Sequence, residues 1–237
     1  MSPTRPTKLI LFDVDGTLID AYGAGRRALE DAFSLVFERD DAAAYLDSVW
    51  FAGKTDLFIF REVAMRAGIT PWDFERRYAE LETRYLERLA AGVEEHAAKR
   101  VLPGVVGLLE TIDDGDGLSL GLMTGNLEQG ARIKIEPWGL NRFFPTGGFG
   151  SDALERSDIG LVALRRFERR LGAAIPPGEV LVVGDTLHDI RAARDCGFRV
   201  LAVGTGWADQ AALKEAAPDI YFSDLSDTAA VLEAIGL

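Results

Sequence analysis

The sequence predicts an α/β fold: a doubly wound parallel sheet of the Rossmann-like kind, with a helical domain inserted after its first strand. Three observations support this prediction. Short apolar runs alternate with amphipathic stretches, the apolar runs contain almost no polar residues, and about a hundred residues separate the first run from the second. Strands that are buried on both faces of a parallel sheet have such uninterrupted runs. A gap of that length exceeds what a crossover needs.

The core elements follow from these patterns. Five apolar runs are predicted strands, most of them bounded by Gly, Asp or Thr: Leu9 to Val14, Leu118 to Met123, Val180 to Val183, Val200 to Val203 and Ile220 to Phe222. Five stretches with helical periodicity lie between them: Val105 to Ile112, Asn126 to Glu136, Ile159 to Leu171, Asp189 to Cys196 and Ala208 to Glu215. Strand and helix alternate, as in a doubly wound domain.

The long gap is predicted to hold a small helical cap. Three amphipathic helices are expected in it, at Gly25 to Phe37, Asp56 to Ala67 and Pro71 to Ala91. The division is therefore a core of residues 1–19 and 98–237 and a cap of residues 20–97. If the cap closes over the core, residues 19–22 and 98–102 are the expected hinges.

Composition limits the partners. The chain has 237 residues and a formal net charge of −12, so its overall field repels nucleic acid and anionic membranes, and an anionic substrate would need a cation. The single cysteine, Cys196, cannot form an intramolecular disulfide, and no apolar stretch resembles a signal peptide or a membrane span. We expect a cytoplasmic protein, monomeric or homodimeric, that binds neither nucleic acid nor membrane.

Polar clusters follow three of the predicted strands, where ligands bind in open α/β sheets. They are Asp13-Val14-Asp15-Gly16-Thr17, Thr124-Gly125-Asn126 and Gly184-Asp185-Thr186-Leu187-His188-Asp189. An acidic residue at a strand end often only caps the next helix, which remains an alternative for any one of them. Four such residues at two strand ends favour a shared ligand site.

The carboxylates in these clusters predict a magnesium site. Asp13 and Asp15 are two residues apart, so they face the same side if the strand stays regular, and two like charges there require a cation. Asp185 and Asp189 add oxygen ligands of the kind that Mg²⁺ prefers. Zinc is disfavoured because His188 is the only histidine in the clusters and none contains a cysteine.

These motifs, in this order, resemble the haloacid dehalogenase-like (HAD) hydrolase superfamily, in particular its phosphoglycolate phosphatase-like branch with a helical C1 cap. The resemblance covers the chain from Lys8 onward. It implies a phosphomonoester hydrolase in which Asp13 attacks phosphorus to form an aspartyl-phosphate. Asp15 would protonate the leaving oxygen and then deprotonate water.

The resemblance also implies the binding residues. Mg²⁺ would be held by the Asp13 carboxylate, the Asp15 carbonyl and Asp185. Asp189 would bind the ion through water or orient a neighbour. Thr124 and the amides of Gly125 and Asn126 would hold the phosphoryl oxygens.

One departure concerns the lysine of a Lys-Pro segment that this branch places before its last motif. The corresponding stretch, residues 150–158, contains no lysine. Lys134 and Arg156 are the two available substitutes. We favour Lys134, because a compact ammonium suits a point contact between two anions.

The substrate is left open by the sequence. Lys54 lies in a segment that resembles the substrate-specificity stretch of this branch, and it could contact substrate or be a solvent-exposed residue beside a helix N-cap. The best candidate is 2-phosphoglycolate, followed by sugar phosphates. A phosphonoacetaldehyde-type hydrolase would use Lys54 as a Schiff base. Non-enzymatic alternatives are a degenerate HAD protein that only binds phosphate and a receiver-type signalling module.

Overall fold

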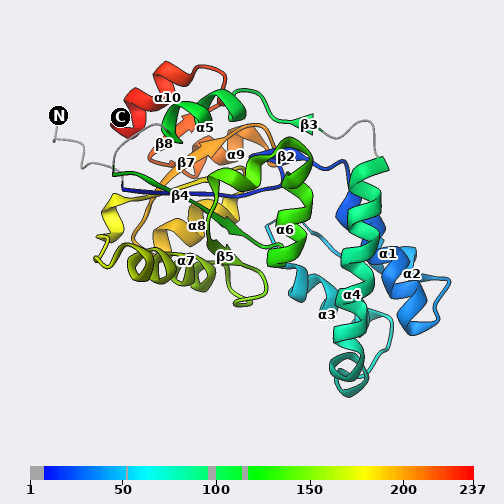
Figure 1. Cartoon of the computed structure of the whole chain (residues 1–237). Helices are drawn as coiled ribbons and strands as arrows, with labels where there is room; N and C mark the ends of the chain where they lie inside the picture. The colour runs from blue at the N-terminus through cyan, green and yellow to red at the C-terminus, as the bar shows by residue number, and fades with distance from the viewer. Residues whose placement is uncertain (1–7, 52, 96–99, 114–116) are drawn as a thin grey trace.

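The structure is a computed structural model, and it describes residues 8–51, 53–95, 100–113 and 117–237 (Figure 1). The expected N-terminal tail and the expected return of the chain at residues 97–98 lie outside these residues. The centre of the fold is a six-stranded sheet in the order β5-β4-β1-β6-β7-β8, and every neighbouring pair is parallel. The predicted doubly wound α/β core is confirmed.

All five predicted strands are present in the sheet, and one further strand, β5, was not predicted. The strands are β1 Leu9–Phe12, β4 Ser119–Thr124, β5 Gly147–Phe149, β6 Val180–Gly184, β7 Arg199–Val203 and β8 Ile220–Phe222. The short edge strand β5 has two glycines, which carry no hydrophobic signal. Its backbone pairs with β4, and a Cβ on Gly147 would lie 2.4 Å from the Leu122 carbonyl oxygen.

Strand β1 fixes the position of everything else in the sheet. Its four residues are buried, and it pairs with β4 on one side and β6 on the other. Alternate residues point to opposite faces: Leu9 and Leu11 enter one apolar cluster, and Ile10 and Phe12 enter the other. The chain runs in opposite directions across the sheet from β1, so its carboxyl end is a switch point of the kind where ligands bind.

Helices cover both faces of the sheet. Buried residues of α5 (Val105–Asp113), α6 (Glu128–Ile135) and α10 (Thr228–Ile235) belong to the cluster that contains Phe12. Those of α7 (Arg156–Leu171), α8 (Leu187–Asp195) and α9 (Gln210–Glu215) belong to the cluster that contains Leu11. In the described part of the core there are also three short 3₁₀ helices, at Glu136–Trp138, Leu140–Phe143 and Pro177–Glu179.

Four cap helices lie together at one end of the molecule (Figure 1): α1 Ala24–Phe37, α2 Ala42–Asp47, α3 Asp56–Arg66 and α4 Pro71–Glu95. The three predicted cap helices are present, and the six-residue α2 is additional. The long helix α4 packs against α6 near Gly130, where an added Cβ would make ordinary contacts, 3.5 Å from Leu89 and 3.7 Å from Tyr85. No helix in the described ranges combines the length and the apolar character needed to cross a membrane.

The chain passes between sheet and cap through a two-stranded antiparallel ribbon. Strand β2, Ile19–Asp20, pairs with β3, Arg100–Val101, and the Leu102 amide donates to the Leu18 carbonyl at 3.0 Å. Both segments coincide with expected hinges. The two-domain division and the hinge motion remain predictions.

Removing the Phe167 side chain should test the packing of α7 on the sheet. This ring fills the space that Gly121 leaves open, since a Cβ on Gly121 would lie 2.4 Å from it. We expect Phe167→Ala to lower the free energy of unfolding by about 3–5 kcal/mol in denaturant titrations. The control, Leu171→Ala on the same helix, alters a side chain that is 50% exposed and should cost about 0.5 kcal/mol at most. Equal losses would contradict this packing.

Candidate active site

The three predicted polar clusters meet at the carboxyl ends of neighbouring strands of the sheet. They follow β1, β4 and β6, which are neighbours, so the ends of these strands bring together residues that are far apart in the sequence. A cavity of about 370 Å³ opens above them, and residues from both the core and the cap line it. The predicted site residues that line it are Asp13, Asp15, Lys54, Thr124, Gly125, Asn126, Lys134, Arg156 and Asp185.

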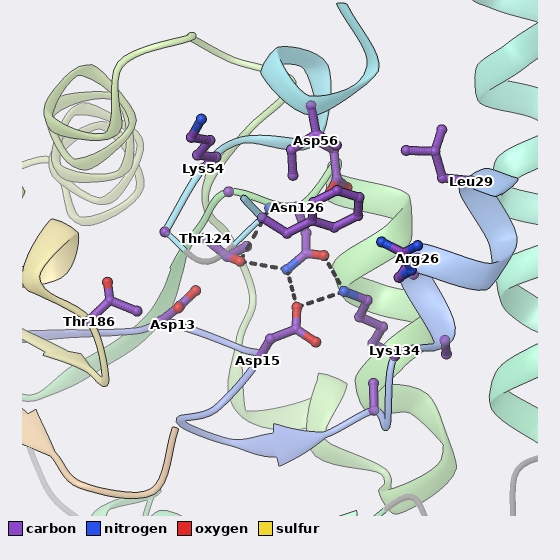
Figure 2. Close-up of a pocket in the computed structure, with 18 of the residues that line it drawn as sticks. Asp13, Asp15, Arg26, Leu29, Lys54, Asp56, Thr124, Asn126, Lys134 and Thr186 are labelled. Atoms are coloured by element: carbon purple, nitrogen blue, oxygen red, sulfur yellow. Dashed lines mark hydrogen bonds and ion pairs between the residues drawn. The ribbon is translucent and has the colours of Figure 1, made fainter. Parts of the chain in front are cut away.

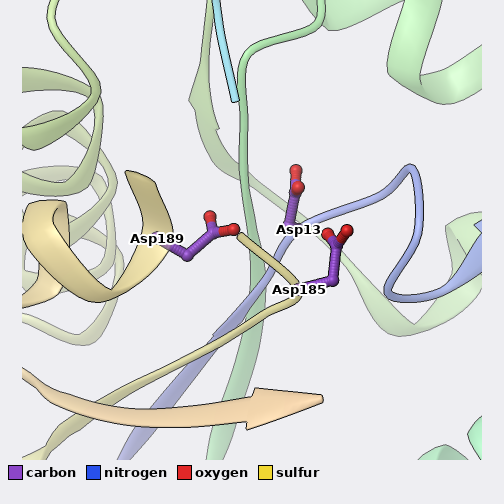
Figure 3. A group of neighbouring side chains, drawn as sticks. All are labelled: Asp13, Asp185 and Asp189. Atoms are coloured by element: carbon purple, nitrogen blue, oxygen red, sulfur yellow. The ribbon is translucent and has the colours of Figure 1, made fainter. Parts of the chain in front are cut away.

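Three carboxylates converge beneath the cavity (Figure 3). Oxygen atoms of Asp13, Asp185 and Asp189 lie within 4.8 Å of one another, and all three residues are buried. Asp185 is enclosed by two glycines: a Cβ on Gly206 would lie 1.6 Å from its Oδ2, and one on Gly16 would lie 2.5 Å from it. Neither position could carry a side chain without displacing the Asp185 carboxylate.

Arg156 is the cation of this acidic cluster. Its Nη2 lies 2.8 Å from Asp13 Oδ2 and 2.6 Å from Asp189 Oδ1, and the residue is 9% exposed. The distances are those of ion pairs, but the Nε and Nη2 groups donate no well-directed hydrogen bond among the described residues. The contact is therefore mainly electrostatic.

The acidic cluster carries more negative than positive charge. Burial raises the pKa of Asp13 to about 6, because desolvation outweighs the opposing effect of Arg156. Burial and the neighbouring carboxylates of Asp189 and Asp13 raise the pKa of Asp185 well above its usual value. The cluster contains three buried carboxylates and one guanidinium, and each carboxylate offers an oxygen atom as a ligand. This set of donors fits a divalent cation such as Mg²⁺.

Asp189 also caps helix α8. Its Oδ2 accepts hydrogen bonds from the Thr186 amide at 3.0 Å and the Thr186 hydroxyl at 2.6 Å, and the Thr186 side chain accepts from the Asp189 amide. This is a capping box. Asp189 therefore belongs both to the capping box of α8 and to the acidic cluster. The hydrogen bonds of the capping box hold its other oxygen, Oδ1, beside Arg156.

A second network surrounds Asp15 (Figure 2). The Asn126 side-chain amide donates to Asp15 Oδ2 at 2.9 Å and to Thr124 Oγ1 at 2.8 Å. The Lys134 ammonium donates to Asp15 Oδ2 at 2.6 Å and to Asn126 Oδ1 at 2.5 Å. Burial alone would lower the pKa of Lys134, but the carboxylates of Asp15 and Asp56 outweigh it and raise that pKa, so the ammonium stays charged.

The contacts assign one cation to each catalytic candidate. We expected Lys134 to replace the missing lysine near Asp13, but the cation beside Asp13 is Arg156, and Lys134 lies beside Asp15. The reason is the side of the sheet from which each approaches. Arg156 is the first residue of α7 on one face, and Lys134 is in the last turn of α6 on the other.

Lys54 lines the cavity, but its ammonium lies 4.4 Å from the centre of the Phe58 ring. In Figure 2 its side chain points away from Asp13 and Asp15. A substrate contact by Lys54 therefore remains a prediction.

Two cavity residues on the cap, Asp56 and Tyr85, were not predicted as site residues. The Asp56 carboxylate accepts from the Leu127 amide at 2.9 Å and from the Tyr85 hydroxyl at 3.5 Å. Helical periodicity is the sequence signal that could have drawn attention to them, because it places both on buried helix faces. Asp56 shares a helix face with the buried Ile59, Phe60 and Val63, and Tyr85 lies in a buried stripe with Leu81 and Leu89.

Comparison with known proteins agrees with this geometry. The family model described as haloacid dehalogenase-like hydrolase matches residues 7–197. A phosphoglycolate phosphatase of Synechococcus elongatus is 29% identical over 92% of this chain and 93% of its own length. Phosphoglycolate phosphatase 1 of Pseudomonas aeruginosa is 28% identical over 94% of this chain and 79% of its own.

Solved structures share the fold. CbbY from Rhodobacter sphaeroides in complex with phosphate superimposes with a TM-score of 0.69 at 20% identity, covering 98% of this chain and 100% of that one. A variant of CbbY in complex with xylulose-(1,5)bisphosphate gives a TM-score of 0.67 at 20% identity, over 93% of this chain and 96% of that one. The family model matches most of the chain, and the acidic residues after β1 and β6 lie together at the carboxyl ends of the sheet strands. The chain belongs to the haloacid dehalogenase-like hydrolases.

Proposed function

We propose that this protein is a magnesium-dependent phosphatase that hydrolyses a small phosphorylated metabolite through an aspartyl-phosphate on Asp13. The observation that carries the proposal is the pair of carboxylates, Asp13 and Asp15, on the wall of one cavity, each with a buried cation of its own. The first candidate substrate is 2-phosphoglycolate. The expected cytoplasmic location and the monomeric or dimeric state remain predictions.

The two carboxylates would share the chemistry. A carboxylate oxygen of Asp13 attacks phosphorus, the bond from phosphorus to the leaving oxygen breaks, and Asp15 gives that oxygen its proton. Water then attacks the aspartyl-phosphate, Asp15 takes a proton from the water, and phosphate leaves with Asp13 restored as a carboxylate. Every atom and proton is accounted for by the two residues, the substrate and one water.

Neighbouring side chains would hold these groups in place. Asn126 and Lys134 both bond Asp15 Oδ2, so they fix the direction of that carboxylate. Thr124 Oγ1 accepts two hydrogen bonds from Asn126, which leaves its own hydroxyl proton to donate to a phosphoryl oxygen. Arg156 orients Asp13 and offsets its charge.

Asp13, Asp185 and Asp189, with the Asp15 carbonyl, would hold the Mg²⁺ ion. When bound, the ion would supply positive charge that offsets the buried carboxylates and the transferring phosphoryl group. This agrees with the charge imbalance of the cluster.

The substrate assignment is supported by the relatives. Two of them are phosphoglycolate phosphatases, and this chain covers most of the length of each. A sugar phosphate is the second candidate, because CbbY has been crystallised with xylulose-(1,5)bisphosphate.

Substituting the proposed nucleophile should abolish turnover. We expect Asp13→Asn to lower magnesium-dependent phosphate release by about a thousandfold or more across a panel of 2-phosphoglycolate and sugar phosphates. The matched control is Asp31→Asn, which alters an exposed carboxylate on α1 and should leave release unchanged. Full activity of Asp13→Asn would refute this mechanism.

Stability of the ion-free protein should fall as pH rises. The folded-state pKa of Asp13, about 6, is above its ordinary value of 3.8, so its contribution is fully present below pH 3.8 and is lost as pH rises through 6. Mg²⁺ should offset this loss, so the ion should raise the melting temperature more at pH 7.5 than at pH 5. Thermal unfolding with and without Mg²⁺ measures this. Asp185→Asn should remove most of the shift, and equal shifts at the two pH values would contradict the proposed site.

The two cations should differ in what their loss does. We expect Arg156→Met to lower kcat/KM about a hundredfold and Arg156→Lys only about tenfold, since the lysine keeps the charge beside Asp13. Lys134→Met should instead move the pH optimum, because Lys134 bonds Asp15. Arg169→Met, at an exposed position on the helix of Arg156, is the control. Identical pH profiles for all variants would argue against separate roles.

A further inference from the structure

The cap segment at residues 53–56 is seated on the core loops of the site. The Asp56 amide donates to the Gly125 carbonyl at 2.7 Å. The backbones approach so closely that a Cβ on Gly125 would lie 2.3 Å from the Lys54 carbonyl oxygen, and one on Gly53 would lie 2.2 Å from the His188 ring. The cap therefore touches the loop after β4 and the first turn of α8 with no room for an intervening side chain.

The Asp56 carboxylate is not needed by its own helix. Thr55 is the N-cap of α3 and accepts from the Phe58 amide at 3.2 Å. The side chain of Asp56 turns to the core instead and accepts the Leu127 amide at 2.9 Å, the residue just before α6 begins. This bond ties the cap to the loop of residues 124–127, which carries Thr124 and Asn126.

The Asp56 carboxylate is partly removed from water, so an ionised form needs neighbouring groups that stabilise its charge. Burial raises the pKa of Asp56 to about 6, and the Lys134 charge and the Leu127 hydrogen bond oppose that rise. The Tyr85 hydroxyl lies 3.5 Å away, and its ring packs edge-on against Phe60 at 4.9 Å between centroids. Cap residues thus surround the carboxylate on one side, and the 124–127 loop and Lys134 surround it on the other.

We propose that Asp56 is a positioning residue of the active site: its carboxylate, as acceptor of the Leu127 amide, fixes the 124–127 loop while the cap is seated. Through that loop it holds Asn126, and Asn126 in turn holds both Asp15 and Thr124. The site is then complete only with the cap in place. The inference rests on the proposed function, and it adds a cap residue to the groups that prepare the phosphoryl site.

The test separates the acceptor from the charge. Asp56→Asn keeps an oxygen that can accept the Leu127 amide, whereas Asp56→Ala removes it. We expect Asp56→Ala to weaken binding of inorganic phosphate, measured calorimetrically with Mg²⁺, and to lower kcat/KM for the best substrate of the panel, each about tenfold or more. Asp56→Asn should stay within about threefold of the native protein in both measurements.

Thr70→Ala is the matched control, because Thr70 accepts from the Asp73 amide at 3.1 Å at the start of α4 and its side-chain hydrogen bonds are made to Asp73 rather than to the 124–127 loop. This substitution also removes one hydrogen-bond acceptor from the cap domain, and it should change neither phosphate binding nor kcat/KM. The proposal is overturned if Asp56→Ala behaves as the native protein, if Asp56→Asn is as impaired as Asp56→Ala, or if Thr70→Ala reproduces the defect.

Two further readouts keep the test decisive. If Asp56→Ala does not fold, hydrogen exchange of the Leu127 amide in the native protein replaces it: slow exchange that phosphate slows further supports the bond, and fast exchange in both states overturns it. If no phosphomonoester is hydrolysed, the phosphate-binding series still decides on Asp56. The proposed function would then fail alone.

Discussion

The burial of three carboxylates, two directly after β1 and β6 and one in the first turn of α8, is the constraint on which the rest of the site depends. Carboxylates taken out of water are costly unless they are paired, and here one guanidinium pairs with Asp13 and Asp189, while Asp185 accepts a hydrogen bond from the Thr17 hydroxyl at 3.2 Å. The ion pairs of Arg156 and the hydrogen bonds that Asp189 accepts from Thr186 in the capping box offset part of that cost. The remaining excess of negative charge leaves a set of oxygen donors that fits a divalent cation.

The two cations show how the sheet organises chemistry from both of its faces. Arg156 reaches Asp13 from the α7 face, and Lys134 reaches Asp15 from the α6 face. Both carboxylates follow β1, which has a layer of helices on each face of the sheet. A cation can therefore approach each carboxylate from a different layer. Each of the two carboxylates therefore has a cation of its own, supplied by a different helix layer.

Strand positions and acidic clusters could be predicted from the sequence, because buried parallel strands have continuous apolar runs and their ends carry the polar residues. Strand β5 could not, since its register comes from backbone pairing with β4 and its glycines have no hydrophobic pattern. The choice between Lys134 and Arg156 depends on which face of the sheet each helix covers, and sequence spacing does not contain that information. Asp56 was not predicted as a site residue, although its spacing from Ile59 and Phe60 places it on the buried face of α3.

The contact of α4 with α6 at Gly130 has a consequence for how such proteins diversify. One apolar cluster runs without interruption from cap residues such as Leu29 and Phe33 to sheet residues such as Phe12 and Leu122. A cap taken from a relative and grafted onto this core would meet the α6 surface rather than open solvent. Recombination should therefore succeed when the donor supplies α6 together with its cap helices, so that the exchanged module includes a piece of the catalytic layer.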